Sequence, residues 1–276
     1  MGKKIEQRSS EQDYVITVNG IRTHIVEAGT GPSLVLVHGL GGPLMWQKVI
    51  EPLSKTSRVI VIDLPGWGDS NGPDEMFTTT QYADFLIQCF DALSIHKAAL
   101  MGISYGGQIA AVATQRFPSR IHKLILIAST GLERRHLLNN NFIWLICSMF
   151  INVVVLHSEW LMCLLARRSF FDIRTRPLDL CSKFYQQISH RGKRDAWLNA
   201  IRNIYTEGDF SERLSEIKIP TLIIWGEGDK TVFPSSGEKI HRQIPNSQLT
   251  MFSQCAHSVP LEKPDDLCKW VVSFLQ

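Results

Sequence analysis

The sequence has few of the features that mark metal-binding or disulfide-stabilised proteins. Its six cysteines include no C-x-x-C pair, and none stands at a zinc-site spacing from a histidine or another cysteine. They are Cys89, Cys147, Cys163, Cys181, Cys255 and Cys268. The pattern argues against a zinc site or a disulfide framework and favours free thiols in a reducing compartment.

Long apolar runs of the kind found in targeting and membrane-spanning segments are also missing. Residues 1–13 are polar and charged, unlike a secretory signal, so a cytoplasmic location is predicted. The most apolar stretch, residues 142–156, is interrupted only by Ser148 and Asn152, but a membrane-spanning helix needs roughly 20 residues. We interpret this stretch as a buried or substrate-facing helix, with peripheral membrane contact as the alternative.

The chain has little net charge of either sign. A formal charge of +3 over 276 residues gives no basis for predicting nucleic-acid binding. Residues 131–208 are more basic, with 11 Lys+Arg against 6 Asp+Glu. This segment is compatible with an anionic substrate or an anionic membrane surface, although a solvated helical face is the simpler explanation.

Short apolar runs without alternation recur along the chain, separated by helical or turn-forming segments. They occupy residues 34–37, 59–62, 98–101, 124–127, 222–225 and 249–252. Such runs are typical of strands buried on both faces of a parallel sheet. Asn19-Gly20, between residues 14–18 and 21–27, predicts a hairpin. Helices are expected at residues 79–93, 105–117, 235–244 and 265–275. The chain is therefore predicted to have an α/β fold with a mostly parallel central sheet flanked by helices.

The alternation of strands and helices stops between residues 127 and 222. The intervening residues are rich in Leu, Trp, Phe and Arg and have helical patterning. An insertion of this length predicts a subdomain rather than a loop. We expect a core built from residues 1–130 and 209–276 and a helical insertion at residues 131–208. Candidate pocket contacts in the insertion are its aromatic residues and Asn139, Asn140, Asn141, Arg167 and Arg168, although packing or surface exposure is the preferred explanation for each.

Residues 102–106 match the pattern G-x-S-x-G, with Ser104 at its centre. The pattern follows a predicted strand and opens a predicted helix, the setting in which a nucleophilic serine occupies a strained turn. Small residues are needed at Gly102 and Gly106 because strand and helix approach each other closely there. Ser104 is therefore the candidate nucleophile.

A serine hydroxyl needs an adjacent base to act as a nucleophile near neutral pH. His257 lies in a loop after the last predicted strand, at the sheet edge where the loop bearing Ser104 also emerges. Asp229 follows the preceding predicted strand and is suited to orient the imidazole. Glu227 and Glu133 are rival carboxylates. The order Ser, Asp, His is that expected for a G-x-S-x-G fold of this kind.

An oxyanion formed by attack of Ser104 must be stabilised by backbone N–H groups. One candidate donor is Tyr105, the residue after the nucleophile. The glycine-rich loop at residues 38–42 offers Leu40 as the second, and His38 is expected to brace this loop rather than take part in catalysis.

Taken together, these segments resemble the α/β-hydrolase family along the whole chain. The matching segments are residues 38–42, 63–70, 102–107, 226–229 and 256–258. The resemblance implies Ser104, Asp229 and His257 as nucleophile, acid and base, and Leu40 and Tyr105 as oxyanion donors. It also implies a structural role for the turn at residues 63–70 and a helical cap over the pocket, with no metal or organic cofactor.

The resemblance leaves several activities open. Related dehalogenases and epoxide hydrolases use an aspartate nucleophile, which Ser104 argues against. Carbon–carbon bond hydrolases of vinylogous diketones usually have tryptophan after the histidine, where this chain has Ser258. The apolar stretch at residues 142–156 favours a lipophilic acyl group, so we predict hydrolysis of a lipophilic carboxylic ester through an acyl-enzyme. The alternatives are carbon–carbon bond hydrolysis and a non-catalytic ligand-binding role, and the oligomeric state is left open.

Overall fold

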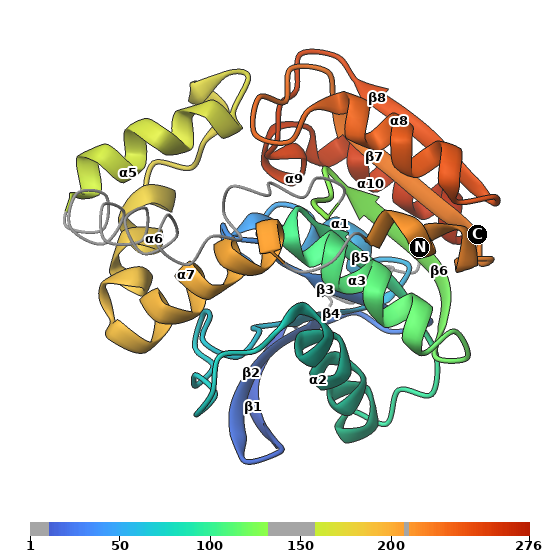
Figure 1. Cartoon of the computed structure of the whole chain (residues 1–276), viewed down its shortest axis with the longest axis horizontal. Coiled ribbons are helices and arrows are strands. Elements are labelled where there is room, and N and C mark those ends of the chain that lie inside the picture. Colours follow the sequence, from blue (N-terminus) through green and yellow to red (C-terminus); the bar gives the residue numbers. More distant parts are fainter. Residues whose placement is uncertain (1–10, 132–157, 207–209) are drawn as a thin grey trace, which may run out of the picture.

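The computed structural model of the chain describes residues 11–131, 158–206 and 210–276. Its centre is an eight-stranded sheet with the order β1-β2-β4-β3-β5-β6-β7-β8 (Figure 1). The strands are β1 Gln12–Val18, β2 Ile21–Ala28, β3 Ser33–Val37, β4 Arg58–Ile62, β5 Ala98–Ile103, β6 Ile121–Ile127, β7 Thr221–Gly226 and β8 Ser247–Phe252. β2 pairs antiparallel with β1 and β4, and all pairings from β4 to β8 are parallel. The predicted mostly parallel sheet is confirmed.

Helices flank this sheet, as predicted. In the described residues they are α1 Ile50–Ser54, α2 Thr79–Ala92, α3 Tyr105–Arg116, α5 Glu159–Ala166, α6 Leu180–Ser189, α7 Arg191–Thr206, α8 Pro234–Gln243, α9 Val259–Glu262 and α10 Pro264–Leu275. α2 packs on α3, α3 on β5 and β6, and α8 on β7 and β8. None of the helices in the described ranges is both long and apolar enough to cross a bilayer.

Local sequence accounts for the start of α2 and for the first turn of the sheet. Thr78 accepts a hydrogen bond from the backbone N–H of Gln81, whose side chain accepts one from Thr78 N–H, so the two form a capping box. Asn19 and Gly20 have φ values of 48° and 79°, which a type I′ hairpin turn requires and which these residue types tolerate.

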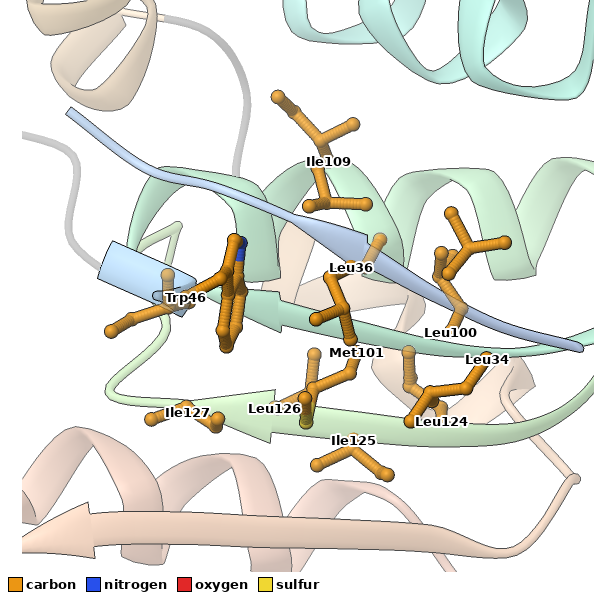
Figure 2. Packing of buried hydrophobic residues seen from close by; sticks show 14 of the residues in the cluster. Leu34, Leu36, Trp46, Leu100, Met101, Ile109, Leu124, Ile125, Leu126 and Ile127 are labelled. Atoms are coloured by element: carbon orange, nitrogen blue, oxygen red, sulfur yellow. The ribbon is translucent and has the colours of Figure 1, made fainter. Parts of the chain in front are cut away.

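The core lies where the parallel strands are covered on both faces. Leu34, Leu36, Leu100, Leu124 and Leu126 are fully buried, and Figure 2 shows them packed together across neighbouring strands. Every residue of β5 and β7 is buried. These strands are therefore apolar without alternation because neither face meets water.

Helices and 3₁₀ turns, with no strand, make up residues 158–206, the described part of the predicted insertion. We call these residues the helical segment. The boundaries 131 and 208 remain a prediction. Asn139–Asn141, Glu133 and the apolar stretch at residues 142–156 lie outside the described residues.

The turn after β4 binds the hairpin to the rest of the sheet. His24 of β2 hydrogen-bonds through Nδ1 to Asp63 Oδ2 (2.7 Å) and through Nε2 to Asp13 Oδ1 (2.5 Å). The Ser70 hydroxyl donates to Asp63 O (2.7 Å) and accepts from His24 N–H (2.8 Å). These contacts agree with a structural role for residues 63–70.

The two carboxylates make the contribution of His24 to stability dependent on pH. The hydrogen bond that His24 donates to Asp63, supported by the one that it donates to Asp13 and opposed by burial, raises the pKa of His24 from 6.5 to about 9. A raised pKa in the folded state stabilises the fold fully below pH 6.5, and the stabilisation is lost as the pH rises through about 9.

We therefore expect the wild type to be more stable than His24→Gln at pH 6, with a difference that shrinks steadily towards pH 9.5. Urea unfolding at several pH values measures this difference. His96→Gln, at an exposed histidine, serves as the control. A stability difference that stays constant from pH 6 to 9.5 would contradict the assignment of a protonated His24.

Candidate active site

Ser104 lies in the sharp turn between β5 and α3. Its backbone has φ 55° and ψ −121°, a sparsely populated conformation for a residue with a side chain. The turn is held from three directions. Ser104 N–H donates to Ile127 O (2.9 Å), and Ser104 O accepts from the N–H groups of Gly107 (3.0 Å) and Thr130 (3.1 Å). The fold thus fixes a strained serine at the carboxyl end of a central strand.

Close backbone contacts explain the glycines on either side of Ser104. A Cβ atom on Gly106 would lie 2.1 Å from Val37 O, and one on Gly102 would lie 2.3 Å from Gly106 O. Neither position has room for a side chain. The contact at Gly102 is the predicted close approach of strand and helix, whereas the contact of Gly106 with β3 was not predicted.

His257 and Asp229 meet at the same edge of the sheet. Asp229 follows β7 and His257 follows β8, and His257 Nδ1 lies 2.8 Å from Asp229 Oδ2. The other carboxylate oxygen, Oδ1, accepts the N–H groups of Thr231 (2.8 Å) and Val232 (3.0 Å). Of the rival acids, Glu227 is exposed. Because the Nδ1–H group donates a hydrogen bond to Asp229 Oδ2, the unprotonated ring nitrogen of His257 is Nε2.

Ser104 and His257 both line a cavity of about 250 Å³. In the described residues no hydrogen bond joins the Ser104 hydroxyl to His257. Catalytic hydrogen bonds are often long in the absence of substrate and shorten in the complex.

The loop after β3 lies directly against the Ser104 turn. A Cβ atom on Gly39 would lie 2.9 Å from Ser104 Cβ and 3.2 Å from the backbone N of Tyr105. Leu40, the next residue, lines the cavity. The two predicted oxyanion donors, Leu40 and Tyr105, therefore belong to segments in van der Waals contact.

His38 braces this loop, as the sequence suggests. Its Nε2 accepts the N–H of Leu64 (3.1 Å), and its Nδ1 donates to Gly39 O (2.9 Å). The ring is completely buried, and burial lowers its pKa below the ordinary value. A neutral His38 satisfies both bonds and links the Gly39 loop to the turn after β4.

The rest of the cavity wall is mainly apolar and comes largely from the helical segment. The apolar lining residues in the described chain are Leu40, Met45, Ile103, Met162, Ala166, Phe170, Leu180, Cys181, Phe184 and Trp197. Ser169, Thr231 and Ser258 add hydroxyl-bearing residues to the lining. Arg167 and Arg168 are exposed and are not among the lining residues. The sequence does not single out these contacts, because nothing in a helical pattern states which face meets a pocket in another part of the chain.

Comparison with known proteins identifies the family. A family model described as "alpha/beta hydrolase fold" matches residues 32–264, most of the chain. The chain belongs to the α/β-hydrolase fold family. The family resemblance drawn from the motifs is therefore confirmed.

The relatives of this α/β hydrolase have names that describe different hydrolytic activities. The chain is 28% identical to a 2-hydroxy-6-oxononadienedioate/2-hydroxy-6-oxononatrienedioate hydrolase of Burkholderia vietnamiensis, covering 99% of this chain and 98% of that protein. It is 26% identical to the human monoacylglycerol lipase ABHD6, in a match that covers 90% of this chain and 76% of the lipase. The crystal structure of a meta-cleavage product hydrolase from Pseudomonas fluorescens is similar over 95% and 97% of the two chains, with 25% identity and a TM-score of 0.80.

Proposed function

We propose that this α/β hydrolase cleaves a carboxylic ester with a lipophilic acyl group through an acyl-enzyme on Ser104. One observation carries the proposal: Ser104 and His257 share a cavity whose described lining is otherwise apolar or hydroxyl-bearing, with no Asp, Glu, Lys or Arg side chain among the described lining residues. Cavities of this kind accept apolar groups and orient them by a few polar contacts.

The proposed reaction has two halves. Ser104 Oγ attacks the ester carbonyl while His257 Nε2 takes its proton, and Asp229 stabilises the imidazolium that forms. The backbone N–H groups of Leu40 and Tyr105 bind the oxyanion. His257 then passes the proton to the departing alcohol. Water then gives a proton to the same imidazole as it attacks the acyl-enzyme carbonyl, and His257 returns that proton to Ser104 Oγ as the acid leaves.

A second candidate is carbon–carbon bond hydrolysis, which the names of several relatives favour. The name of the Burkholderia relative describes a substrate with two carboxylates. Burying a carboxylate without a cationic partner is costly, and the described lining residues provide none. Arg176 lies behind the wall, where its Nη1 donates to Cys181 Sγ (2.8 Å), so it is the group to test if such a substrate is cleaved. Ser258, in place of tryptophan after the base, also supports the ester.

A series of 4-nitrophenyl esters from acetate to dodecanoate tests the proposal beside a 2-hydroxy-6-oxo-dienoate. Burial of each additional CH₂ contributes about 0.8 kcal/mol, so we expect kcat/KM to rise about fourfold per CH₂ until the cavity is full and then to fall. A higher kcat/KM on the diketone acid than on every ester would reject ester hydrolysis as the main activity.

A matched pair of variants locates the acyl site. Leu180 lines the cavity and Leu178 is 97% exposed two residues away. Leu180→Trp should move the preferred ester to a shorter chain, whereas Leu178→Trp should leave the profile unchanged. An identical profile in both variants would place the acyl group elsewhere.

A further inference from the structure

Besides Asp229, the buried carboxylate of Glu262 lies on the side of the His257 loop that faces the helical segment. It is the last residue of α9 and is 9% exposed. No cation pairs with it within the described residues. Its partners are two backbone amides and a thiol: Oε2 accepts Ala256 N–H (2.8 Å) and Cys255 Sγ–H (3.9 Å), and Oε1 accepts Phe171 N–H (2.6 Å). An uncompensated buried carboxylate is expensive, so the two amide bonds, with the weaker thiol bond, account for its place there.

The two bonds of Glu262 join segments that carry different parts of the site. Ala256 immediately precedes His257, and Phe171 belongs to the helical segment, 91 residues away from Glu262 in sequence. Burial raises the pKa of the Glu262 carboxyl above its ordinary value, and the bonds from Ala256 and Phe171 oppose that rise. The carboxylate therefore depends on both segments being in place.

Residues 169–171 also bind the catalytic loops without Glu262. Ser258 N–H, on the other side of His257, donates to Ser169 O (2.9 Å). The Phe171 ring covers Gly228, where an added Cβ atom would lie 2.8 Å from Phe171 Cδ2, next to Asp229. His257 is thus flanked by two links to the same three residues, one direct and one through Glu262.

We propose that Glu262 is a positioning residue that ties the orientation of His257 to the seating of residues 169–171 of the helical segment. This proposal rests on the proposed role of His257 as the base. Glu262 does not contact the reacting atoms. It holds Ala256, the residue before His257, in a position fixed by its second bond to Phe171 of the helical segment. Small displacements of a catalytic group lower the rate far more than they lower substrate binding.

Glu262→Gln tests the proposal with little change in shape. The amide oxygen can accept only one of the two N–H groups, and its NH₂ must face the other. We expect kcat on the best ester to fall roughly 10- to 100-fold, with KM changed less than threefold. Glu238→Gln, the same substitution at an exposed residue of α8, should leave both constants unchanged.

A structural role alone must be separated from positioning. End-point labelling by a fluorophosphonate counts the folded, reactive sites, so turnover is expressed per labelled serine. A loss confined to the labelled fraction, or a kcat per site within twofold of wild type, would overturn the proposal. If Glu262→Gln does not fold, Glu262→Asp, which keeps the charge but is one CH₂ shorter, is judged by the same criteria. If the wild type neither turns over esters nor becomes labelled, the proposed function itself fails, and this inference falls with it.

Discussion

In Ser104→Ala, turnover of the best ester is expected to fall by at least about 10⁴-fold while the fold is kept. The substitution removes only the attacking oxygen, and the residual rate from oxyanion donors and substrate binding is small when the nucleophile is lost. Serine already adopts the strained φ of 55° at this position, and alanine would adopt the same φ, so the substitution adds no backbone strain. Steady-state kinetics and thermal unfolding measure the two quantities.

Ser169→Ala removes another hydroxyl from the same cavity and is the matched control; its rate should stay within a few-fold of wild type. A fluorophosphonate should label the wild type and Ser169→Ala but not Ser104→Ala. Retention of more than a few per cent of activity by Ser104→Ala would reject a covalent mechanism on this serine. An unlabelled wild type that still binds acyl ligands would instead identify a ligand-binding member of the fold.

Asp229→Asn is expected to lower kcat by about 10³- to 10⁴-fold with little loss of stability. The amide oxygen of asparagine still accepts the N–H groups of Thr231 and Val232, which hold Asp229 Oδ1 in the wild type. Its NH₂ then faces His257 Nδ1 and forces the ring proton onto Nε2. A histidine protonated at Nε2 cannot take the proton of Ser104.

Glu227→Gln is the control for this prediction, because Glu227 is two residues away and exposed. Its kcat should equal that of the wild type. Both variants should unfold at the wild-type temperature within a few degrees. Equal rates for Asp229→Asn and the wild type, or a large loss in Glu227→Gln, would show that the orienting acid has been misassigned.

The strands and the nucleophile turn were predictable because their signals are local. Residues 98–101 are apolar on both faces because β5 is completely buried, and Gly102 and Gly106 are small because backbone atoms lie against them. The hairpin at Asn19-Gly20 follows from the φ values that those two residues tolerate. In each case a few consecutive residues contain the whole physical cause.

The pairing of Asp229 with His257 was predictable for a topological reason. The carboxyl ends of neighbouring parallel strands emerge at one edge, so loops after β7 and β8 are brought together although 28 residues separate the two side chains. By contrast, the short helix α9 between His257 and Pro264 was not foreseen, since four residues carry no periodic pattern. Glu262 was missed with it.

From its sequence alone, this chain was bound to form a parallel sheet with Ser104 in a strained turn and with Asp229 and His257 on loops at the same edge. Burial and backbone crowding act over a few consecutive residues, so they fix the strands and the Ser104 turn. The parallel arrangement of the strands brings the loops bearing Asp229 and His257 to the same edge. Only the tertiary structure decided which faces of the helical segment line the cavity and that Glu262 bridges Ala256 and Phe171. Those contacts depend on how segments that are distant in sequence pack together, and such packing leaves no pattern in either segment.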